Sequence, residues 1–467
     1  MQELIETPGF EWALLVQVAA IIGFILGLVL VAQILTSQKV PSATFGWILL
    51  IVILPFIGIP LYLFFGRRKF HSQVRRKLKL KLAEHDSCHQ HEIQSLLMAL
   101  GVPASTKNNV VKFHNNGQHA FEELVDLIEN AKQSIDIGCY LFGKDASGDR
   151  ILSILREKIA QGVKVRLLID GIGSFHFPTK RLRQFKKNGG EYAWFIPIFQ
   201  APFNGRSNLR LHRKMIIVDR ERIWSGGRNI SDLYFDLGDK EKAWIDLSFT
   251  QQGPVATCYA TIFESDWLFA TGNQTQKLPN ITRASGKGQS LVQVIPSGPD
   301  VKEDPLPAAL TSACYAAKSK ITLVSPYFIP GSGIEQAIIL AALRGVQVNI
   351  VVPQESDHRI ADIARDRTLR SLSDAGVNIW LVAGSMMHAK AYVFDDNIAF
   401  CGSANLDIRS LYLNCEVMSC FYSKPDIKWL TEWSDNLIED ALRYEGQSTS
   451  YFKRMIEGII LLVAYQL

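Results

Sequence analysis

The sequence predicts an α/β protein in which two tandem α/β units with mixed sheets follow two N-terminal transmembrane helices. Three observations predict this fold. Two long uncharged stretches lie near the N-terminus, strand and helix patterns alternate over the remainder, and that alternation occurs twice with a matching motif late in each copy. At 467 residues the chain is longer than one ordinary domain. The formal net charge of +5 is mild and indicates no class of partner by itself.

The first expected element is a membrane anchor over residues 1–66. Trp12–Leu35 and Phe45–Phe65 are uncharged and each is long enough to cross a bilayer as a helix. A cleaved signal peptide fits poorly, because the residues before the first run are acidic, that run is too long, and a second run follows. Pro55 and Pro60 predict a bent second helix, because proline removes a backbone hydrogen-bond donor.

The distribution of positive charge predicts the orientation of the anchor. Gly66–Lys81 is dense in Lys and Arg, whereas Lys39 is the only basic residue between the two apolar runs. Because Lys and Arg concentrate on the cytoplasmic side, we expect the N-terminus and everything after Phe65 to be cytoplasmic. Residues 67–107 form the expected basic linker, which either attracts anionic headgroups or serves as a topology signal alone.

The rest of the chain contains a repeat, with a first copy over 108–278 and a second over 306–450. Each copy reads helix, strand, helix, strand, which implies α/β layers. The expected elements are Ala120–Ala131, Ser134–Phe142, a helix ending at Gly162 and Val163–Asp170, then Leu306–Ala317, Lys320–Pro330, a helix ending at Gly345 and Val346–Pro353. A Gly/Ser/Pro-rich linker is expected over 279–305. The apolar tail, 451–467, is too short to span and either lies in the interface or packs on the core.

Each copy ends in a stretch of identical spacing, Leu211–Asn229 and Met387–Asn405. A Lys follows the His by two positions, an Asp follows that Lys by five, and an Asn stands 17 residues after the His. The matched residues are His212, Lys214, Asp219 and Asn229, and His388, Lys390, Asp395 and Asn405. One such His-x-Lys pair alone would be an ordinary surface strand, but two copies with identical flanks indicate a shared function.

The second stretch is predicted to fold as a β-hairpin. A tight turn at Asp396-Asn397 would place Asn405 opposite His388 and Ser403 opposite Lys390. Residues two apart on a strand share a face. These four side chains would therefore converge on one surface.

The first stretch is predicted to fold in the same way. A turn at Arg220-Glu221 would place Asn229 opposite His212 and Gly227 opposite Lys214. The motif Asp stands at odd spacing from its His in both stretches. We therefore expect it to face away and to stabilise local structure.

A His, a Lys and an Asn on one face suit a phosphate ester. Lys supplies positive charge and three donors, and His attacks phosphorus or moves a proton near neutral pH. Two sets supply a nucleophile and a general acid, while Lys214 and Lys390 hold the charge on the phosphoryl oxygens. No metal and no cofactor is expected, because neither His has neighbours at ligand spacing. The seven cysteines are scattered without a CxxC pair, which is typical of a reduced compartment.

The motif H-x-K-x4-D followed by G-[GS]-x-N, present twice, resembles the phospholipase D superfamily. The anchor ending in "YLFFGRR", together with "NLRLHRK", "SPYFIP" and "GSANLDIRSLYLNCE", is similar to bacterial cardiolipin synthases. The resemblance covers nearly the whole chain. One departure is visible, since the first copy has "GGRN" where the second has "GSAN" and so lacks the hydroxyl of Ser403.

The resemblance implies a two-step transfer. One His attacks the phosphorus of phosphatidylglycerol, displaces glycerol and forms a phosphatidyl-histidine. The other His protonates the leaving oxygen, then deprotonates a hydroxyl of a second phosphatidylglycerol, which attacks to give cardiolipin. His212 is favoured as the nucleophile and His388 as the acid/base, although symmetric spacing leaves the reverse open. Asp246 and Glu416 resemble the acids that orient these histidines, and Asn229, Ser403 and Asn405 complete the expected binding set.

Other functions remain open from sequence. Water as the acceptor would give a hydrolytic phospholipase D, and phosphatidylethanolamine could replace one phosphatidylglycerol. A membrane-tethered nuclease is disfavoured by the apolar runs and by the lack of an aromatic-interleaved basic stripe. A non-catalytic scaffold is disfavoured because both motifs are complete. The resemblance also implies the bacterial cytoplasmic (inner) membrane, multi-pass, with phosphatidylglycerol and anionic lipids as partners, and leaves homo-oligomer formation open.

One further segment has the character of a membrane surface. The basic helix expected over 178–190 carries Leu182 and Phe185 among Lys and Arg residues. It either holds anionic headgroups or presents an ordinary solvated face.

Overall fold

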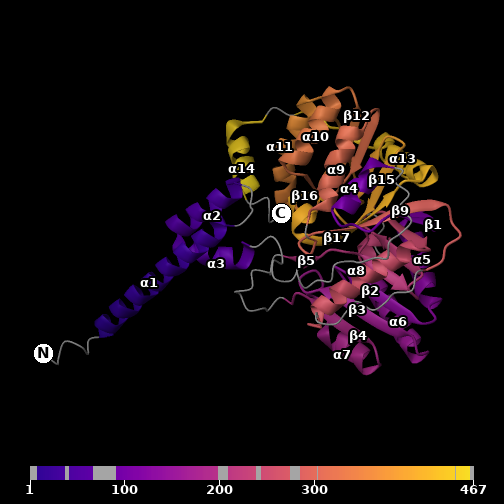
Figure 1. Ribbon diagram of the computed structural model, residues 1–467, viewed down its shortest axis with the longest axis horizontal. Coiled ribbons are helices and arrows are strands. Elements are labelled where there is room, and N and C mark those ends of the chain that lie inside the picture. The colour runs from indigo at the N-terminus through magenta and orange to yellow at the C-terminus, as the bar shows by residue number, and fades with distance from the viewer. Residues whose placement is uncertain are drawn as a thin grey trace. The chain divides into compact units, whose positions relative to one another are not determined.

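The computed structural model describes residues 8–36, 41–66, 91–197, 209–237, 243–273, 284–301, 303–446 and 449–462 (Figure 1). The chain divides into a helical unit, 1–68 with 198–208, and an α/β unit, 69–197 with 209–467. Lys39, Cys88 and the basic run after Gly66 lie outside the described residues. The expectations that concern them therefore remain predictions.

The helical unit contains α1 (Pro8–Leu35), α2 (Pro41–Ile53) and α3 (Pro55–Phe65). Among the described residues, α1 is the one helix long and apolar enough to cross a membrane, over Leu14–Leu35. The expectation of one bent helix over Phe45–Phe65 is corrected to two helices, because the chain breaks at Leu54, before a proline that cannot continue the hydrogen-bond ladder. α3 folds back toward α2, since a Cβ on Gly58 would lie 2.6 Å from the carbonyl oxygen of Leu50.

The α/β unit is built on one mixed sheet, which in the described part of the chain has 16 strands. The strands of the first repeat are β1 (Thr106–His114), β2 (Ser134–Cys139), β3 (Lys164–Asp170), β4 (Glu191–Phe195), β5 (Arg210–Leu211), β6 (Met215–Val218), β7 (Arg222–Gly226) and β8 (Ser248–Gln252). The later strands of the unit are β9 (Ser290–Ser297), β10 (Lys320–Val324), β11 (Phe328–Ile329), β12 (Gln347–Pro353), β13 (Asn378–Val382), β14 (Ala391–Phe394), β15 (Ile398–Gly402), β16 (Leu406–Asp407), β17 (Asn414–Phe421) and β18 (Leu442–Arg443). β11 and β16 pair with each other outside this sheet.

The strand order confirms the tandem repeat. From the middle outward, the first repeat runs β1-β8-β7-β6-β2-β3-β4 and the second runs β9-β17-β15-β14-β10-β12-β13. In both, the outer strands are parallel and the inner ones antiparallel. β1 pairs with β9 and joins the halves. The segment expected as a linker, 279–305, thus contains a central strand, β9, which is buried almost throughout and pairs with β1 and β17.

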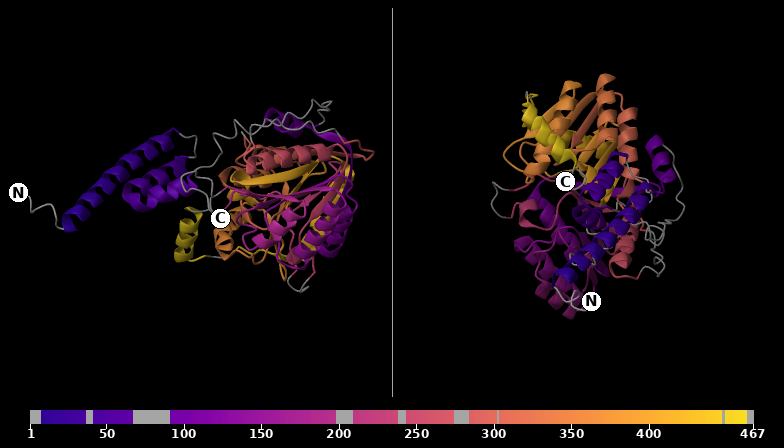
Figure 2. Two further views of the ribbon diagram at one scale, coloured as in Figure 1. Left: turned by 90° about the horizontal axis from the view of Figure 1, so that it is seen from below. Right: turned by 90° about the vertical axis from the view of Figure 1, so that its left-hand side faces the viewer.

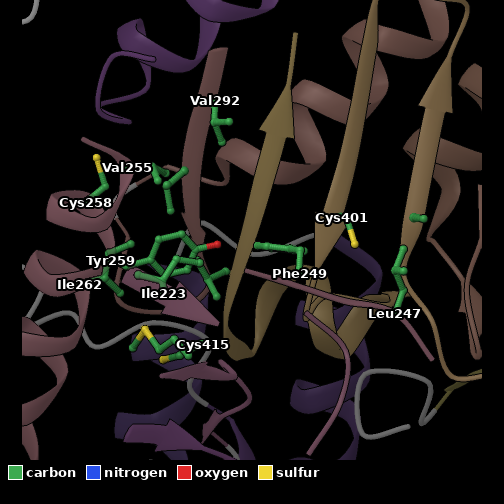
Figure 3. Packing of buried hydrophobic residues seen from close by; sticks show 14 of the residues in the cluster. Ile223, Leu247, Phe249, Val255, Cys258, Tyr259, Ile262, Val292, Cys401 and Cys415 are labelled. Atoms are coloured by element: carbon green, nitrogen blue, oxygen red, sulfur yellow. The ribbon is translucent and has the colours of Figure 1, made fainter. Parts of the chain in front are cut away.

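Helices cover both faces of this sheet (Figures 1 and 2). They are α4 (Glu92–Ala99), α5 (Gly117–Glu129), α6 (Ala146–Ala160), α7 (Thr179–Lys187), the 3-10 turn η2 (Asp232–Tyr234), α8 (Val255–Ala270), α9 (Pro305–Ala316), α10 (Ser332–Leu343), α11 (Arg359–Asp374), α12 (Ile408–Tyr412), α13 (Lys424–Glu439) and α14 (Tyr451–Leu462). α8 and α13 pack in a core shared by both repeats, to which Tyr259, Ile262 and Ile223 belong (Figure 3). Separate cores lie under α5 to α7 and under α9 to α11.

The C-terminal helix α14 packs on α11 through charged contacts. Arg370 pairs with the buried Glu457, and Lys453 pairs with Asp366 at 2.9 Å. Its aromatic residues Tyr451 and Phe452 are exposed. The helix therefore packs on the core by one side and presents apolar side chains on the other, whereas the alternative of a place in the membrane interface stays a prediction.

The motif hairpins form, but their predicted register is wrong by one residue. Met215 pairs with Ser225, and Ala391 pairs with Cys401, so Lys390 falls opposite Gly402 instead of Ser403. Each turn has three residues instead of two. The motif Asp itself opens each turn in the left-handed region, with φ of 54° at Asp219 and 51° at Asp395.

Candidate active site

Each His-x-Lys segment lies at the carboxyl end of the parallel strands of its own repeat. Met215, directly after the first segment, pairs with Gly138 at the carboxyl end of β2. Ala391, directly after the second, pairs with Val324 at the carboxyl end of β10. The carboxyl ends of parallel strands are where open α/β sheets place their ligands.

Each histidine is oriented by a carboxylate from the other repeat. Nδ1 of His212 lies 2.7 Å from Oε1 of Glu416, and Nδ1 of His388 lies 2.7 Å from Oδ2 of Asp246. Both carboxylates are fully buried. The predicted orienting acids are thus in contact with the histidines, and the pairing crosses between the repeats.

The backbone explains this crossing. β5, which ends one residue before His212, pairs with β17, and the amide of His212 donates to the carbonyl of Cys415 at 2.9 Å. Correspondingly, Ile245 bridges to Met387, and the amide of His388 donates to the carbonyl of Ile245 at 2.7 Å. Short strand exchanges therefore place each acid beside the opposite histidine.

Burial favours the neutral form of both imidazoles. Desolvation lowers the pKa of His212 to about 4 and that of His388 to about 3, against the carboxylates that raise them. Burial opposes ionisation of Glu416, but His212, Lys214 and hydrogen bonds from His212 and Ser403 outweigh it and lower its pKa. A neutral imidazole that donates Nδ1–H to a carboxylate presents a basic Nε2.

The two motif lysines are buried close to the same two carboxylates, Asp246 and Glu416. Nζ of Lys214 donates to the carbonyl of His212 at 3.0 Å, and Nζ of Lys390 lies 2.8 Å from Nδ1 and 3.1 Å from Nε2 of His388. Desolvation lowers the pKa of Lys214 to about 7 and of Lys390 to about 8, despite the nearby carboxylates. Both groups therefore titrate close to neutrality.

The GGRN and GSAN sequences support the two acids differently. Oγ of Ser403 donates to Oε2 of Glu416 at 2.6 Å, so the hydroxyl of the second repeat supports the histidine of the first. Gly227 stands at the matching position, where a Cβ would lie 2.1 Å from Oδ1 of Asp246. That oxygen accepts from the amide of Leu247 at 2.7 Å instead.

The two motif asparagines are buried but differ in partners. Nδ2 of Asn229 donates to the hydroxyl of Tyr234 at 2.8 Å. Oδ1 of Asn405 is buried and has no hydrogen-bond partner among the described residues. Asn405 therefore retains an unused acceptor at the site.

Asp219 and Asp395 lie in the hairpin turns and do not contact the histidines. The carboxylate of Asp219 accepts from the amides of Lys132, Gln133 and Ser134 at 2.7–3.2 Å. Asp395 accepts at 2.8–2.9 Å from the amides of Lys318, Ser319 and Lys320, in the matching connection before β10. They face away from the histidines as expected, and that they stabilise the local structure stays a prediction.

Several site residues were not predicted from the sequence. Tyr140 packs edge-on against His212, and Tyr234 and Trp244 pack against His388. Arg213 is buried and binds Asp266 at 2.6 Å while its Nε donates to the carbonyl of Glu416. A charged residue between the motif His and Lys was the signal available for Arg213, whereas the aromatic residues carry no spacing signal.

One group of possible metal ligands occurs in the described residues, and it includes neither motif histidine. It comprises His114, His119 and Glu123, whose ligand atoms lie within 4.8 Å of one another. Lys112 already forms an ion pair with Glu123.

Two crossed His–carboxylate pairs on a duplicated α/β sheet define a protein of the phospholipase D superfamily. Residues 124–267 and 310–438 match the family model described as "Cardiolipin synthase, PLD-like domain". Residues 25–67 match a phospholipase D–nuclease N-terminal model. The chain belongs to the cardiolipin synthase family.

Curated relatives match over most of their length. A cardiolipin synthase of Listeria welshimeri is 31% identical over 444 residues, which is 90% of this chain and 92% of that relative. Cardiolipin synthase 1 of Bacillus anthracis is 31% identical over 462 residues, 92% of this chain and 90% of that one. A phosphatidylserine synthase structure from Haemophilus influenzae shares the fold, with a TM-score of 0.61 and 16% identity over 81% of this chain and 100% of that chain.

Proposed function

We propose that this protein is a phosphatidyltransferase that makes cardiolipin from two phosphatidylglycerol molecules and releases glycerol. The observation that carries this proposal is the pair of neutral, buried histidines, each held by a carboxylate of the other repeat. Two histidines with separate orienting acids suit a reaction that needs both a nucleophile and an acid/base. We infer the lipid substrates from membership in the cardiolipin synthase family.

In the first step, Nε2 of His212 attacks the phosphorus of one phosphatidylglycerol. The bond from phosphorus to the glycerol oxygen breaks, and that oxygen takes a proton from His388. A phosphatidyl-histidine remains. The Lys390 ammonium, 3.1 Å from Nε2 of His388, is placed to supply the proton to this imidazole, and the lowered pKa of Lys390 favours such sharing.

In the second step, His388 removes the proton from a hydroxyl of another phosphatidylglycerol. That oxygen attacks phosphorus, the P–N bond to His212 breaks, and cardiolipin leaves. Lys214 and Lys390 balance the charge on the phosphoryl oxygens during both steps. The two steps together balance, because the proton that the acceptor hydroxyl loses in the second step replaces the proton given to glycerol in the first.

The surroundings of the two imidazoles favour His212 as the nucleophile. Among the described residues no donor lies on Nε2 of His212, so its lone pair is available. Nε2 of His388 lies 3.1 Å from Nζ of Lys390, which suits proton exchange better than attack on phosphorus. His212 is also the more exposed of the two, at 9% against 4%.

We also propose that the catalytic unit faces the cytoplasm at the bacterial cytoplasmic membrane. α1 would span, and the apolar segment of α2 and α3 would return the chain to the cytoplasmic side. The Lys/Arg-rich run after Gly66 supports this orientation. A cysteine at Lys39 should react with an impermeant reagent only from outside the cell, and labelling only from inside would contradict it.

The division of the chain also remains a proposal. We assign residues 1–66 to the anchor and 67–107 to the linker. Residues 108–278 and 306–450 form the two catalytic repeats around the joining segment, and 451–467 form the tail.

A product assay tests the proposed function. Purified full-length protein in phosphatidylglycerol vesicles, without added metal, should form cardiolipin and release one glycerol for each cardiolipin. Phosphatidic acid as the sole lipid product would make water the acceptor and the protein a hydrolytic phospholipase D. Absence of any phospholipid turnover would contradict the proposal.

A further inference from the structure

The connections that follow the matched strands β3 and β12 differ in chemistry. Residues 171–178 after β3 read "GIGSFHFP", and within them Ile172 and Phe175 are 46% and 57% exposed. Residues 354–358 after β12 read "QESDH", with acidic residues in place of the apolar ones. Each connection follows the carboxyl end of a parallel strand, the end that holds the histidine of its own repeat, so the first repeat presents an apolar tip there and the second does not.

The base of this apolar connection, which we call the 171–178 loop, is fixed to the active site. Asp170 accepts from the amide of Ile172 at 2.8 Å through Oδ1 and from the amide of Leu211 at 2.9 Å through Oδ2. Leu211 directly precedes His212. The same carboxylate therefore holds the loop and the segment that carries the proposed nucleophile.

A second set of contacts ties the loop to the aromatic wall of the site. Oγ of Ser174 donates to the carbonyl of Tyr140 at 2.9 Å and accepts from the amide of Phe142 at 3.0 Å. A Cβ on Gly173 would lie 2.4 Å from that carbonyl oxygen, so the base of the loop lies close against the backbone of Tyr140. Tyr140 packs against His212 with ring centroids 5.1 Å apart. A rigid base thus carries two exposed apolar side chains.

The helix that follows the loop is basic on its outer side. α7 buries Leu182 and Phe185 completely against the core. Lys180, Arg183, Lys186 and Lys187 are exposed and form no ion pair with any described residue, and α7 contains no acidic residue. This surface therefore carries four positive charges that no described acidic residue neutralises in an ion pair.

An exposed apolar residue also lies next to a residue that contacts the second histidine. Leu233, 44% exposed, precedes Tyr234, which is buried and packs edge-on against His388 at 5.3 Å. Exposed apolar side chains therefore occur beside segments that contact each histidine.

We propose that the 171–178 loop and α7 dock on an anionic phospholipid bilayer, with Ile172 and Phe175 inserted at the headgroup–acyl boundary and α7 on the phosphates. This inference rests on the proposed function and names the surface that delivers the lipid. Apolar side chains with adjacent Lys and Arg are the chemistry that binds such an interface. Docking there places headgroup phosphates beside His212 while the acyl chains stay in the bilayer.

The first test compares two forms of the substrate. The double variant Ile172→Asp/Phe175→Asp of the full chain should lose at least about fivefold in rate on phosphatidylglycerol vesicles, since it removes most of the apolar area that inserts. On monomeric short-chain phosphatidylglycerol below its aggregation concentration, its rate should stay within about twofold of wild type.

A matched control is available on the same unit. Leu343 is 68% exposed at the end of α10, which leads into the amino end of β12 and so lies at the opposite end of the second repeat's parallel strands from His388. Leu343→Asp should leave both rates unchanged. An equal loss for the loop variant on vesicles and monomers would overturn the docking surface, because it would show damage to the site itself.

A second test does not depend on turnover. An environment-sensitive fluorophore at Phe175→Cys, in a chain with Cys88→Ser, should be quenched by lipids brominated on their acyl chains in vesicles containing phosphatidylglycerol. The six described cysteines are buried, and Leu343→Cys supplies the unquenched control. A label at 175 that remains in water would overturn the proposal, even if the protein makes cardiolipin. A quenched label without cardiolipin formation would uphold docking and contradict the proposed function instead.

Discussion

The two repeats carry the same motif but depend on each other to use it. Each supplies a His, a Lys and a turn Asp, yet the carboxylate on each His comes from the opposite repeat. The segments that cross are short, Arg210–Leu211 against β17 and Ile245 against Met387. A single repeat therefore cannot form a working half of the active site, because an isolated copy would contain a histidine without its orienting acid.

The repeats also differ in what surrounds that shared motif. Arg213 stands in the first motif and is buried in an ion-pair network, whereas Ala389 stands in the second. Ser403 supports Glu416 by a hydrogen bond, whereas Gly227 leaves space for Asp246. Identical spacing thus supports two different environments, as expected if the histidines have different roles.

The largest effect should come from removing either histidine. His212→Ala and His388→Ala should each lower transfer from phosphatidylglycerol by at least about 10³-fold, because nucleophile and acid/base act as a unit. A product assay with mass spectrometry measures the rate, and thermal unfolding checks that the variants fold. A variant that folds and keeps the wild-type rate would exclude its histidine from the reaction.

The pH dependence should reveal the buried lysines. kcat/KM should rise through a pKa of about 4, where His212 loses its proton, and should fall between about pH 7 and 8, where Lys214 and Lys390 lose theirs. The sign follows because attack needs neutral His212, whereas phosphate binding and proton supply need charged lysines. A rate that rises near pH 6.5 and stays constant to pH 9.5 would contradict this electrostatic picture.

The Gly/Ser difference between the repeats should produce unequal losses. Gly227→Ala should lower activity by roughly 10- to 100-fold, because the new methyl group must displace Asp246. Ser403→Ala removes one hydrogen bond to a carboxylate and should cost roughly tenfold. If the two losses were measured as equal, or reversed, the repeats would not support their acids in the way described.

The smallest effect on activity should come from the turn aspartates. Asp395→Ala removes three backbone-amide partners and should lower the free energy of unfolding by about 1–3 kcal/mol, with most of the activity kept at low temperature. Asp395→Asn retains a residue that tolerates positive φ and should lose less. Denaturant titration measures both. Loss of turnover without loss of stability would assign Asp395 to the chemistry.

Much of the fold could be predicted because local signals agree with the final structure. Strands such as Lys164–Asp170 and Gln347–Pro353 are largely apolar runs that begin within two residues of a helix-ending glycine. The hairpin register was wrong because a positive-φ Asp lengthens the turn, which spacing does not reveal. The second apolar run was long enough to span, but Pro55 divides it.

The residues of the site could be predicted, but the contacts between those far apart in the sequence could not. Spacing located His212 and His388, and the family resemblance located Asp246 and Glu416. Nothing in the chain order indicates that Glu416 contacts a residue 204 positions away instead of the nearer His388. That choice depends on β5 reaching β17, which is a property of the tertiary fold.

The crossed pairing itself can be tested with a phosphatidyl ester of p-nitrophenol, whose leaving group needs no acid. Asp246→Asn should still release a burst of p-nitrophenol and accumulate a phosphatidyl adduct on His212, identified by mass spectrometry, because only acid/base catalysis at His388 is impaired. Glu416→Gln should lose the burst, because it removes the acid that orients the nucleophile. A burst in Glu416→Gln but not in Asp246→Asn, or an adduct on His388, would contradict the account.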